Sequence, residues 1–374
     1  MYIKKISEDY LINQNKSVFE AIKKIDSNKV QFDLNEPYAP FMSSLVRFYI
    51  VDSETLKANE SDGDWGQEYL LANSAGTGAY SITAHDPNVE TRMAKNNNYF
   101  LGIAEIAPNE AILRYNLDAP TVRTLISNDE HDISSNWLPT DVKAAIADSG
   151  DKLAKVVSAG GWYFKINTTR APLDDVNCRK SLAYALDYDS LVGTFQVTDD
   201  IAAGQKARGP IPQGMIGYSD DVPLVEYNLD KAKDYLSKCK YSGDDLKITI
   251  NWIAEVPFEE SWALILQQGA MAIGYEASVE TLPWAVFTEQ VTKPETTPNL
   301  SIVAVQAQTP DPDGLIYNMY HSAAAGTWQS TEWVQDDNID SMLIVWLTLY
   351  FWFSHPDAAT AAAALLLLLM LLGS

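Results

Sequence analysis

The chain has 374 residues, of which 47% are hydrophobic and 21% are charged. This length predicts about two or three globular domains, and the composition is sufficient to fill their cores. The formal net charge is −23, because 50 Asp and Glu residues outnumber 27 Lys and Arg residues. Such an excess of negative charge repels phosphate backbones and anionic membrane surfaces, so nucleic acid is excluded as a principal partner and a membrane surface is disfavoured.

The chain contains two cysteines, Cys178 and Cys239. Two cysteines cannot form the framework of several bridges that small secreted domains use, and their spacing is not that of a CxxC redox or zinc motif. One structural bridge between them is compatible with the sequence. We expect two free, buried thiols instead.

Both ends of the sequence are unusual. No apolar segment follows the lysines near Met1, so no signal peptide is predicted there. Residues 342–353 and 358–372 are nearly continuous apolar runs, separated by Pro356. Each run is shorter than the roughly 20 residues that a membrane-spanning helix needs. We favour an aberrant end, such as a frameshift, over a hydrophobic anchor or hairpin, or a buried core helix.

The first half of the chain predicts mainly strands, because polar and apolar residues alternate in short runs. Asn96 begins a run of three asparagines that closes one of these strands as a turn. A helix follows, with Asp118 as its N-cap and Pro120 in its first turn. The expected strands are 28–34, 79–84, 89–95 and 109–115, and the expected helix is 118–127.

The second half predicts strands that alternate with helices. Residues 246–282 form a βαβ pattern, in which Gly274 ends the helix, and such a unit implies two parallel strands. The fold class is therefore α/β, with two lobes. The remaining elements are a strand at 162–167, helices at 175–192 and 228–240, and a strand at 301–308.

Motifs of common enzymes are absent from this sequence. It contains no HExxH, GxSxG, Walker A or GxGxxG pattern, and its four histidines are scattered without metal-like spacing. The acidic segment 311–314 fails as an EF-hand loop, because that register places Thr309 and Tyr320 at ligand positions. We therefore expect a protein without catalytic residues, cofactor or metal.

Four segments, in order along the chain, resemble one known family. They are a GTGAY segment leading to a NNNYF turn, an NTTRAPLDDVNCRK segment, a GPIP segment followed by a lysine-rich helix, and a DPDG loop. In this combination they resemble the extracytoplasmic solute-binding proteins of ABC importers, in the dipeptide, oligopeptide and nickel-binding family, family 5. The segments lie at 76–100, 162–192, 209–240 and 309–320.

The resemblance implies a two-lobed periplasmic-binding-protein fold of the type II kind. The sequence departs from the family pattern at Ala79, where proline is usual, and at Cys178, Ser181 and Leu182. The family's N-terminal part is missing, so lobe I is expected to be incomplete. The expected divisions are 1–164 for partial lobe I, 165–300 for lobe II, 301–340 for a return segment to lobe I, and 341–374 for a hydrophobic tail that does not match the family.

The resemblance also implies a function without chemistry on the ligand. Two lobes would close on a solute, because the ligand binds the closed form better and shifts the population towards it. The closed complex, expected to be a monomer, would dock on an ABC permease, whose ATPase drives import. The family resemblance places such a protein in the periplasm or on the extracellular face of the membrane.

Seven residues are candidate ligand contacts. Gln306 and Gln308 lie on one face at the end of the last expected strand, beside the loop that contains Asp311, and paired amides are unusual on a plain core strand. Polar residues on an exposed edge remain an equal interpretation for them. Aromatic residues could supply flat walls, although such side chains more often belong to a core. The aromatic candidates are Trp162, Tyr163, Trp252 and Trp284.

The expected ligand is an oligopeptide, with an oligosaccharide as the alternative. Peptide-binding members of the family hold the free α-amino group with an Asp just before the DPD loop, and Gln308 stands at that place here. A neutral amide loses the charge-assisted pairing with an ammonium group, whereas Gln and Trp together suit a hydroxyl-rich ligand. A secreted hydrolase is the competing class of protein.

Overall fold

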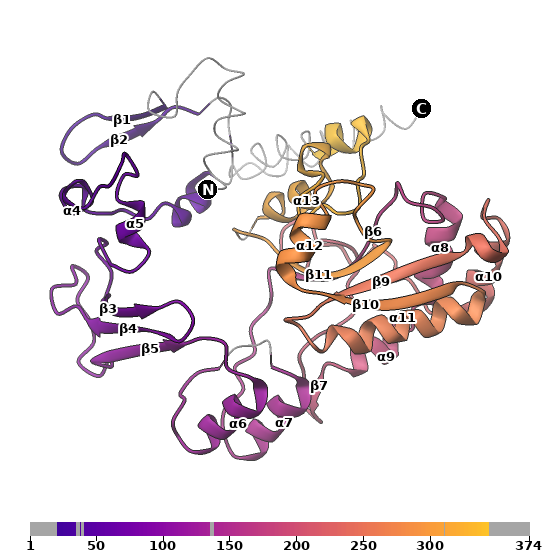
Figure 1. The fold of residues 1–374 in the computed structure, drawn as a ribbon, viewed down its shortest axis with the longest axis horizontal. Coiled ribbons are helices and arrows are strands. Elements are labelled where there is room, and N and C mark those ends of the chain that lie inside the picture. The colour runs from indigo at the N-terminus through magenta and orange to yellow at the C-terminus, as the bar shows by residue number, and fades with distance from the viewer. Residues whose placement is uncertain (1–20, 35–37, 39–40, 135–137, 310, 344–374) are drawn as a thin grey trace.

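The computed structural model describes residues 21–34, 38, 41–134, 138–309 and 311–343. Its best-packed part is a four-stranded sheet with strand order β10-β9-β11-β6 (Figure 1). Strands β10 and β11 both run parallel to β9, and β6 is antiparallel to β11. The strands are β6 (Gly160–Ile166), β9 (Lys247–Ile253), β10 (Glu276–Leu282) and β11 (Leu300–Gln306).

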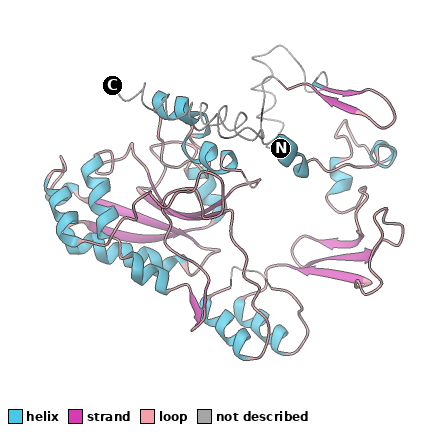
Figure 2. Cartoon of the chain, turned by 180° about the vertical axis from the view of Figure 1, so that it is seen from behind, coloured by secondary structure: helices cyan, strands magenta, loops and turns pink. Residues whose placement is uncertain are grey.

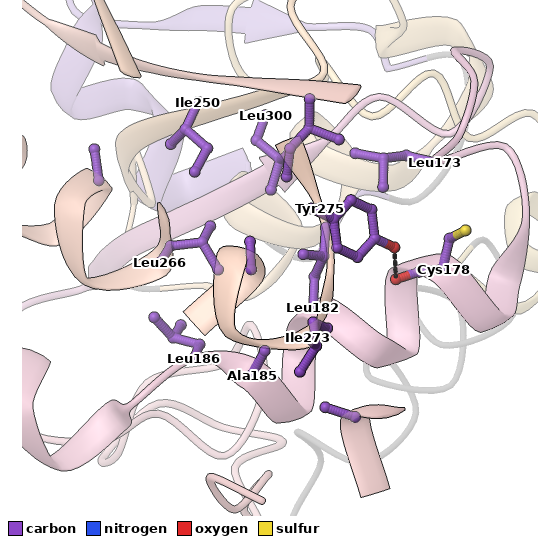
Figure 3. Packing of buried hydrophobic residues seen from close by; sticks show 14 of the residues in the cluster. Leu173, Cys178, Leu182, Ala185, Leu186, Ile250, Leu266, Ile273, Tyr275 and Leu300 are labelled. Carbon is purple, nitrogen blue, oxygen red and sulfur yellow. Dashed lines mark hydrogen bonds between the residues drawn. The ribbon is translucent and has the colours of Figure 1, made fainter. Parts of the chain in front are cut away.

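Helices cover both faces of this sheet around β11, which explains why Leu300, Ile302, Val303 and Val305 alternate between two buried faces. One face carries Ile250, Leu300 and Ile302, which pack against Leu182 and Leu266 of the helices (Figure 3). Helices on this face are α8 (Val176–Ala185), α9 (Tyr188–Gly193), α10 (Leu229–Ser237) and α11 (Glu259–Ile273). The opposite face packs against α12 (Trp284–Gln290) and α13 (Asp313–Tyr320), which contribute Phe287, Leu315 and Met319.

The N-terminal half consists of small units arranged one after another along the chain (Figures 1 and 2). A hairpin is followed by short helices, by a three-stranded antiparallel sheet, and then by a helix pair that packs around Val122, Val142 and Ile146. These elements are β1 (Ile22–Lys24), β2 (Val30–Phe32), α3 (Phe41–Ser44), η1 (Leu45–Arg47), α4 (Ser53–Ala58), α5 (Gln67–Leu70), β3 (Tyr80–Asp86), β4 (Glu90–Lys95), β5 (Glu110–Arg114), α6 (Ala119–Ser127) and α7 (Thr140–Asp148).

Several sequence predictions are confirmed by these elements. The βαβ unit is parallel, and α11 ends at Gly274, whose φ of 118° is the left-handed conformation expected after a helix. The side chains of Asp118 and Asn228 cap α6 and α10, as predicted. The remaining short elements are β7 (Gln196–Thr198), β8 (Ile201–Ala202), η2 (Gly243–Asp245) and η3 (Ser322–Ala324).

Two predictions are wrong. The single helix expected over 175–192 is broken, because Leu186 is extended and Asp187 caps a second helix through the backbone N–H groups of Asp189 and Ser190. The prediction of free thiols is also wrong, since Cys178 and Cys239 form a disulfide between α8 and the residues after α10. The hydrophobic runs predicted at 342–353 and 358–372 lie outside the described residues, except for Met342 and Leu343.

The crossing of α8 and α11 depends on a glycine. A Cβ atom at Gly269 would lie 1.9 Å from the carbonyl oxygen of Ala185, so Gly269→Ala must push the two helices apart. We expect this change to lower the free energy of unfolding by about 1–3 kcal/mol, the usual cost of overpacking. Gly193→Ala is the control, because a Cβ there meets nothing within 4 Å. Equal stability of the two variants in urea unfolding would contradict this view of the crossing.

The disulfide should contribute strongly to stability, because it joins residues separated by 61 positions. Closing a loop of that length in the unfolded chain is worth about 4 kcal/mol in the chain-entropy description. We expect the double change Cys178→Ser with Cys239→Ser to lower the unfolding midpoint accordingly. A phosphine reductant should lower the midpoint of the wild type and leave the double variant unchanged. A wild-type midpoint that does not respond to the reductant would rule out the bridge.

Candidate functional site

The candidate site is the sheet edge at which the parallel strands end. Strands β9, β10 and β11 end there at Ile253, Leu282 and Gln306, and the antiparallel β6 begins there at Gly160. Open α/β sheets bind ligands outside the carboxyl ends of their strands, where the chain leaves the sheet in loops. We call this region the carboxyl edge.

All seven predicted ligand residues lie at or near the carboxyl edge. Gln306 is the last residue of β11, and Trp284 opens α12 directly after β10. Trp162 and Tyr163 pair with Ala304 and Val303, close to the end of β11. The other three are Trp252, the next-to-last residue of β9, and Gln308 and Asp311 in the loop after β11.

Strand alternation, however, separates the aromatic candidates. Trp162 and Trp252 face the layer of α8 and α11, and the Trp162 ring lies 5.6 Å from that of Trp262 and 5.8 Å from that of Phe258. Tyr163 faces the opposite layer, where its hydroxyl donates to the carbonyl of Pro210 at 2.9 Å. Burial raises the pKa of Tyr163 to about 12. One ligand therefore cannot contact the ring faces of Trp162 and Tyr163 from the same side of the sheet.

Trp284 is the most accessible of the aromatic candidates, with 36% of its surface exposed. Its ring packs edge to face against Trp328 at 5.3 Å, and its backbone N–H donates to the Glu255 carboxylate at 3.0 Å. The two indoles form a partly exposed aromatic surface at the carboxyl edge. Sequence reasoning did not single out Trp328. It lies far from Trp284 along the chain, and no local pattern indicates that the two side chains are in contact.

The loop after β11 gathers polar groups from distant parts of the chain. Gln306 and Gln308 are exposed, and the Arg47 guanidinium donates to the Gln308 carbonyl at 3.2 Å. The Tyr38 hydroxyl donates to the Asp313 carboxylate at 2.8 Å. Sequence reasoning missed Tyr38, Arg47 and Asp313 as possible site residues.

Asp311 is buried in the same loop, where it accepts the backbone N–H of Asp313 at 2.9 Å. Burial raises the pKa values of both Asp311 and Asp313, and the Asp311 charge adds to the effect on Asp313. The Tyr38 hydroxyl opposes the shift at Asp313, and its own pKa is raised by burial and by the Asp313 charge. The loop thus concentrates two carboxyl groups that a cationic ligand group would favour in their ionised form.

A buried carboxyl lies just inside the carboxyl edge. Glu259, the first residue of α11, is 1% exposed, and its oxygens accept the Trp162 indole N–H and the Ile253 backbone N–H, both at 3.1 Å. These bonds hold the Trp162 ring and tie α11 to the end of β9. Loss of solvation outweighs both donors and raises the pKa of Glu259 to about 8.

A buried ion pair fixes the return segment against β6. The Lys165 ammonium lies 2.6 Å from Glu332 Oε1 and donates to the Gln329 carbonyl at 2.8 Å. Burial lowers the pKa of Lys165 and raises that of Glu332, and each charge opposes the shift of the other. Removing one partner would leave an uncompensated charge in the interior, so the pair fixes this packing whether or not it adds net stability.

An open hollow of about 470 Å³ lies away from these residues, between α6 and α7. Arg123, Thr124 and Asp141 are among the residues that line it, and none of the seven candidates does so. We place the candidate site at the carboxyl edge instead, because ligand-type polar and aromatic groups from separate strands converge there. Among the helices that the structure describes, none is both long and apolar enough to cross a membrane.

The sequence profile of the bacterial extracellular solute-binding proteins, family 5 (middle region), matches residues 3–327. The chain belongs to this family. The match confirms the resemblance carried by the four motif segments, and it includes the strand ends that define the carboxyl edge.

Family 5 relatives include proteins named for peptide binding. The dipeptide-binding protein of Escherichia coli K12 is 26% identical over 313 residues, which cover 81% of this chain and 56% of that protein. Di/tripeptide-binding protein 2 of Pseudomonas aeruginosa is 27% identical over 279 residues, covering 72% of this chain and 50% of the relative. The chain therefore spans about half the length of these relatives.

Solved structures show the same two-lobed fold. A dipeptide-binding protein of Pseudoalteromonas, in complex with Met-Leu, aligns with a TM-score of 0.72 at 17% identity, covering 92% of this chain and 66% of that one. A periplasmic binding protein of Helicobacter pylori, in complex with the peptide STSA, aligns with a TM-score of 0.66 at 21% identity, covering 87% and 62%. The α/β class and the binding-protein fold predicted from the sequence are thus confirmed.

Glu259 should make stability fall as pH rises. Its pKa is about 8 in the folded protein against 4.5 for an ordinary glutamate, so the folded state holds a proton that the unfolded state has released between these values. The contribution of Glu259 to stability is then greatest below about pH 4.5 and decreases, by up to about 1.4 kcal/mol per pH unit, until about pH 8. We expect Glu259→Gln to remove this decrease, measured by urea unfolding at several pH values.

Glu260→Gln is the matched control, since Glu260 is the exposed neighbour on the same helix. This variant should keep the pH dependence of the wild type. An unchanged slope in Glu259→Gln would show that Glu259 is ionised at neutral pH.

Proposed function

We propose that this chain captures an oligopeptide-like ligand between two lobes and delivers it to an ABC permease for import. The observation that carries the proposal is the carboxyl edge, where exposed amides, carboxyl groups and an aromatic pair converge at the ends of β10, β9 and β11. The family membership supports the same function, because one relative is named a dipeptide-binding protein and one structural neighbour is named an ABC transporter-associated binding protein. Binding and release, without chemistry on the ligand, are sufficient for this role.

The Cys178–Cys239 disulfide supports an extracytoplasmic location. Disulfides persist mainly in oxidising compartments such as the periplasm or the cell exterior. The family description also refers to extracellular proteins. We therefore propose that the protein acts in the periplasm or on the extracellular face of the membrane, where a solute is collected before it reaches the permease.

A peptide suits the polar groups of this edge better than a wholly neutral ligand does. Exposed Gln306 and Gln308 offer amide donors and acceptors that match a peptide backbone, and Arg47 places a positive charge near Gln308. Asp311 in the same loop and Asp313 at the start of α13 add two carboxyl groups, which a cationic ligand group would favour in their ionised form. Gln308 and Trp284 are also the groups that would favour an oligosaccharide, which is the second candidate ligand class.

Isothermal titration calorimetry with the full chain tests the ligand class. The ligands are a short free peptide, its N-acetylated form and a β-linked oligosaccharide. We expect the free peptide to bind and acetylation to weaken binding by less than about tenfold, because neutral Gln308 cannot form the charge-assisted bond of a carboxylate. Gln308→Ala should weaken both peptide forms equally. Gln268→Ala serves as the control, because Gln268 is exposed near the end of α11 that leads into the start of β10.

Three outcomes would contradict parts of this proposal. A loss of 30-fold or more on acetylation would assign the α-amino group to a carboxylate such as Asp311. Binding of the oligosaccharide without binding of the peptide would replace the ligand class. Conversion of any peptide or oligosaccharide in a mixed library, detected by mass spectrometry, would show a hydrolase instead of a binding protein.

A further inference from the structure

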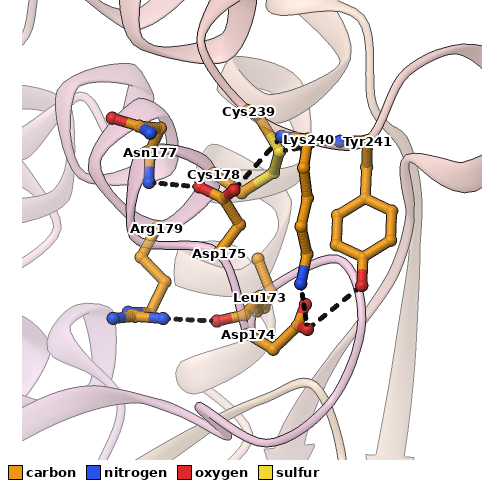
Figure 4. A network of polar contacts seen from close by, with 9 residues as sticks. All are labelled: Leu173, Asp174, Asp175, Asn177, Cys178, Arg179, Cys239, Lys240 and Tyr241. Carbon is orange, nitrogen blue, oxygen red and sulfur yellow. Dashed lines mark hydrogen bonds and ion pairs between the residues drawn. A yellow bond between two sulfur atoms is a disulfide. The ribbon is translucent and has the colours of Figure 1, made fainter.

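Two sulfur atoms and a carboxylate meet between the start of α8 and the end of α10 (Figure 4). The Sγ atoms of Cys178 and Cys239 and a carboxylate oxygen of Asp175 all lie within 4.8 Å of one another. Cys178 is fully buried, whereas Cys239 and Asp175 are partly exposed, so an ion could reach the group from the Asp175 side. We propose that these three residues bind a soft divalent cation, such as zinc, when the disulfide is reduced.

The donor set matches this class of cation. Thiolate sulfur is the preferred protein ligand of zinc, and a carboxylate oxygen commonly completes its shell. A tetrahedral ion with bonds to sulfur of about 2.3 Å needs its two sulfurs about 3.8 Å apart. The Cα atoms of Cys178 and Cys239 are 5.3 Å apart, so the sulfurs could reach this separation by side-chain rotation. A water molecule would occupy the fourth position.

The frame around the sulfurs does not depend on the bridge between them. The backbone N–H of Lys240 donates to Asp175 at 3.1 Å, and the Asn177 side chain donates to the Lys238 carbonyl at 3.2 Å. The Lys240 ammonium and the Tyr241 hydroxyl both contact the Asp174 carboxylate, at 2.7 and 3.1 Å (Figure 4). These contacts would hold the two helix ends together after reduction, so the ligands remain assembled.

The chemistry exchanges one sulfur–sulfur bond for two sulfur–metal bonds. A thiol or phosphine reductant supplies two electrons, the sulfur–sulfur bond breaks, and each sulfur takes up one proton. The incoming cation then displaces both thiol protons, which pass to solvent. The Lys240 ammonium, paired with Asp174, offsets part of the negative charge of two thiolates and a carboxylate. The disulfide and the metal complex are therefore alternative states, and metal affinity should fall as pH falls.

Titration of the full chain with Cd²⁺ tests the site, because cadmium bound to thiolate absorbs in the ultraviolet through sulfur-to-metal charge transfer. A phosphine is the reductant, since it does not compete as a thiolate ligand. We expect the absorption band to saturate at about one equivalent in the reduced protein, with the release of two protons, and to be absent in the oxidised protein. Zn²⁺ should displace the cadmium and remove the band.

Asp175→Asn tests the carboxylate as a metal ligand without removing the helix cap, because asparagine can still cap α8 through its side-chain oxygen. We expect this variant to bind Cd²⁺ at least about tenfold more weakly, the scale of losses when a metal site loses one supporting group. Cys178→Ser should abolish the band. Asp200→Asn, a change at an exposed turn, is the control and should behave as the wild type.

Near-ultraviolet circular dichroism of the reduced, metal-free protein completes the test. Retention of the native spectrum is expected from the contacts around Asp174 and Asp175. Loss of the native spectrum on reduction would overturn the proposal, because the ligands would no longer be assembled. A reduced protein that shows no charge-transfer band, or a band that survives in Cys178→Ser, would overturn it equally.

Discussion

The described structure depends on burial of β11 from both sides. Leu300 and Ile302 point into one helical layer, whereas Val303 and Val305 point into the other, so this strand joins two hydrophobic cores. Buried backbone groups need hydrogen-bond partners. Strand β11 pairs with β6 from Leu300 to Gln306 and with β9 at Leu300 and Ser301. The ends of the strands in this sheet then fix the positions of Trp252, Trp284 and Gln306 at the carboxyl edge. Arg47 and Tyr38 reach the same edge from the N-terminal half. Ligand-type residues are thus placed by the packing of the core and not by the loops alone.

Local sequence patterns made most of the four-stranded sheet and its helices predictable. Alternation of apolar residues, a glycine after the helix and side-chain caps are all signals within a few residues, and they specified the βαβ unit before any contact was known. The same locality explains one error, because the run 175–192 has helical composition throughout. Its interruption depends on Asp187, whose side chain caps a new helix more favourably than it would serve an interior position. At this position the aspartate cap therefore outweighs the apolar spacing on either side of it.

Contacts between distant residues could not be predicted in this way. Tyr38 reaches Asp313, Arg47 reaches Gln308, and Trp284 packs on Trp328, but each pair joins segments whose separation the sequence does not encode locally. The disulfide could not be predicted either, because the sequence does not show how far apart two isolated cysteines lie in the fold. Strand alternation did contain one unused signal. It placed Trp162 and Tyr163 on opposite faces of one strand, which already argued against a shared ligand wall.

The antiparallel direction of β6 has a consequence for the architecture of the whole chain. Because Gly160 pairs with Gln306, the polypeptide enters this sheet and leaves it at neighbouring positions on the same edge. The first and last residues of the segment 160–306 therefore lie side by side. A unit of this kind can be inserted into a host domain through two adjacent strands without disturbing the host's own path. In this chain, α13 then packs back on the same sheet, because Leu315 and Met319 join the core of Val303 and Val305.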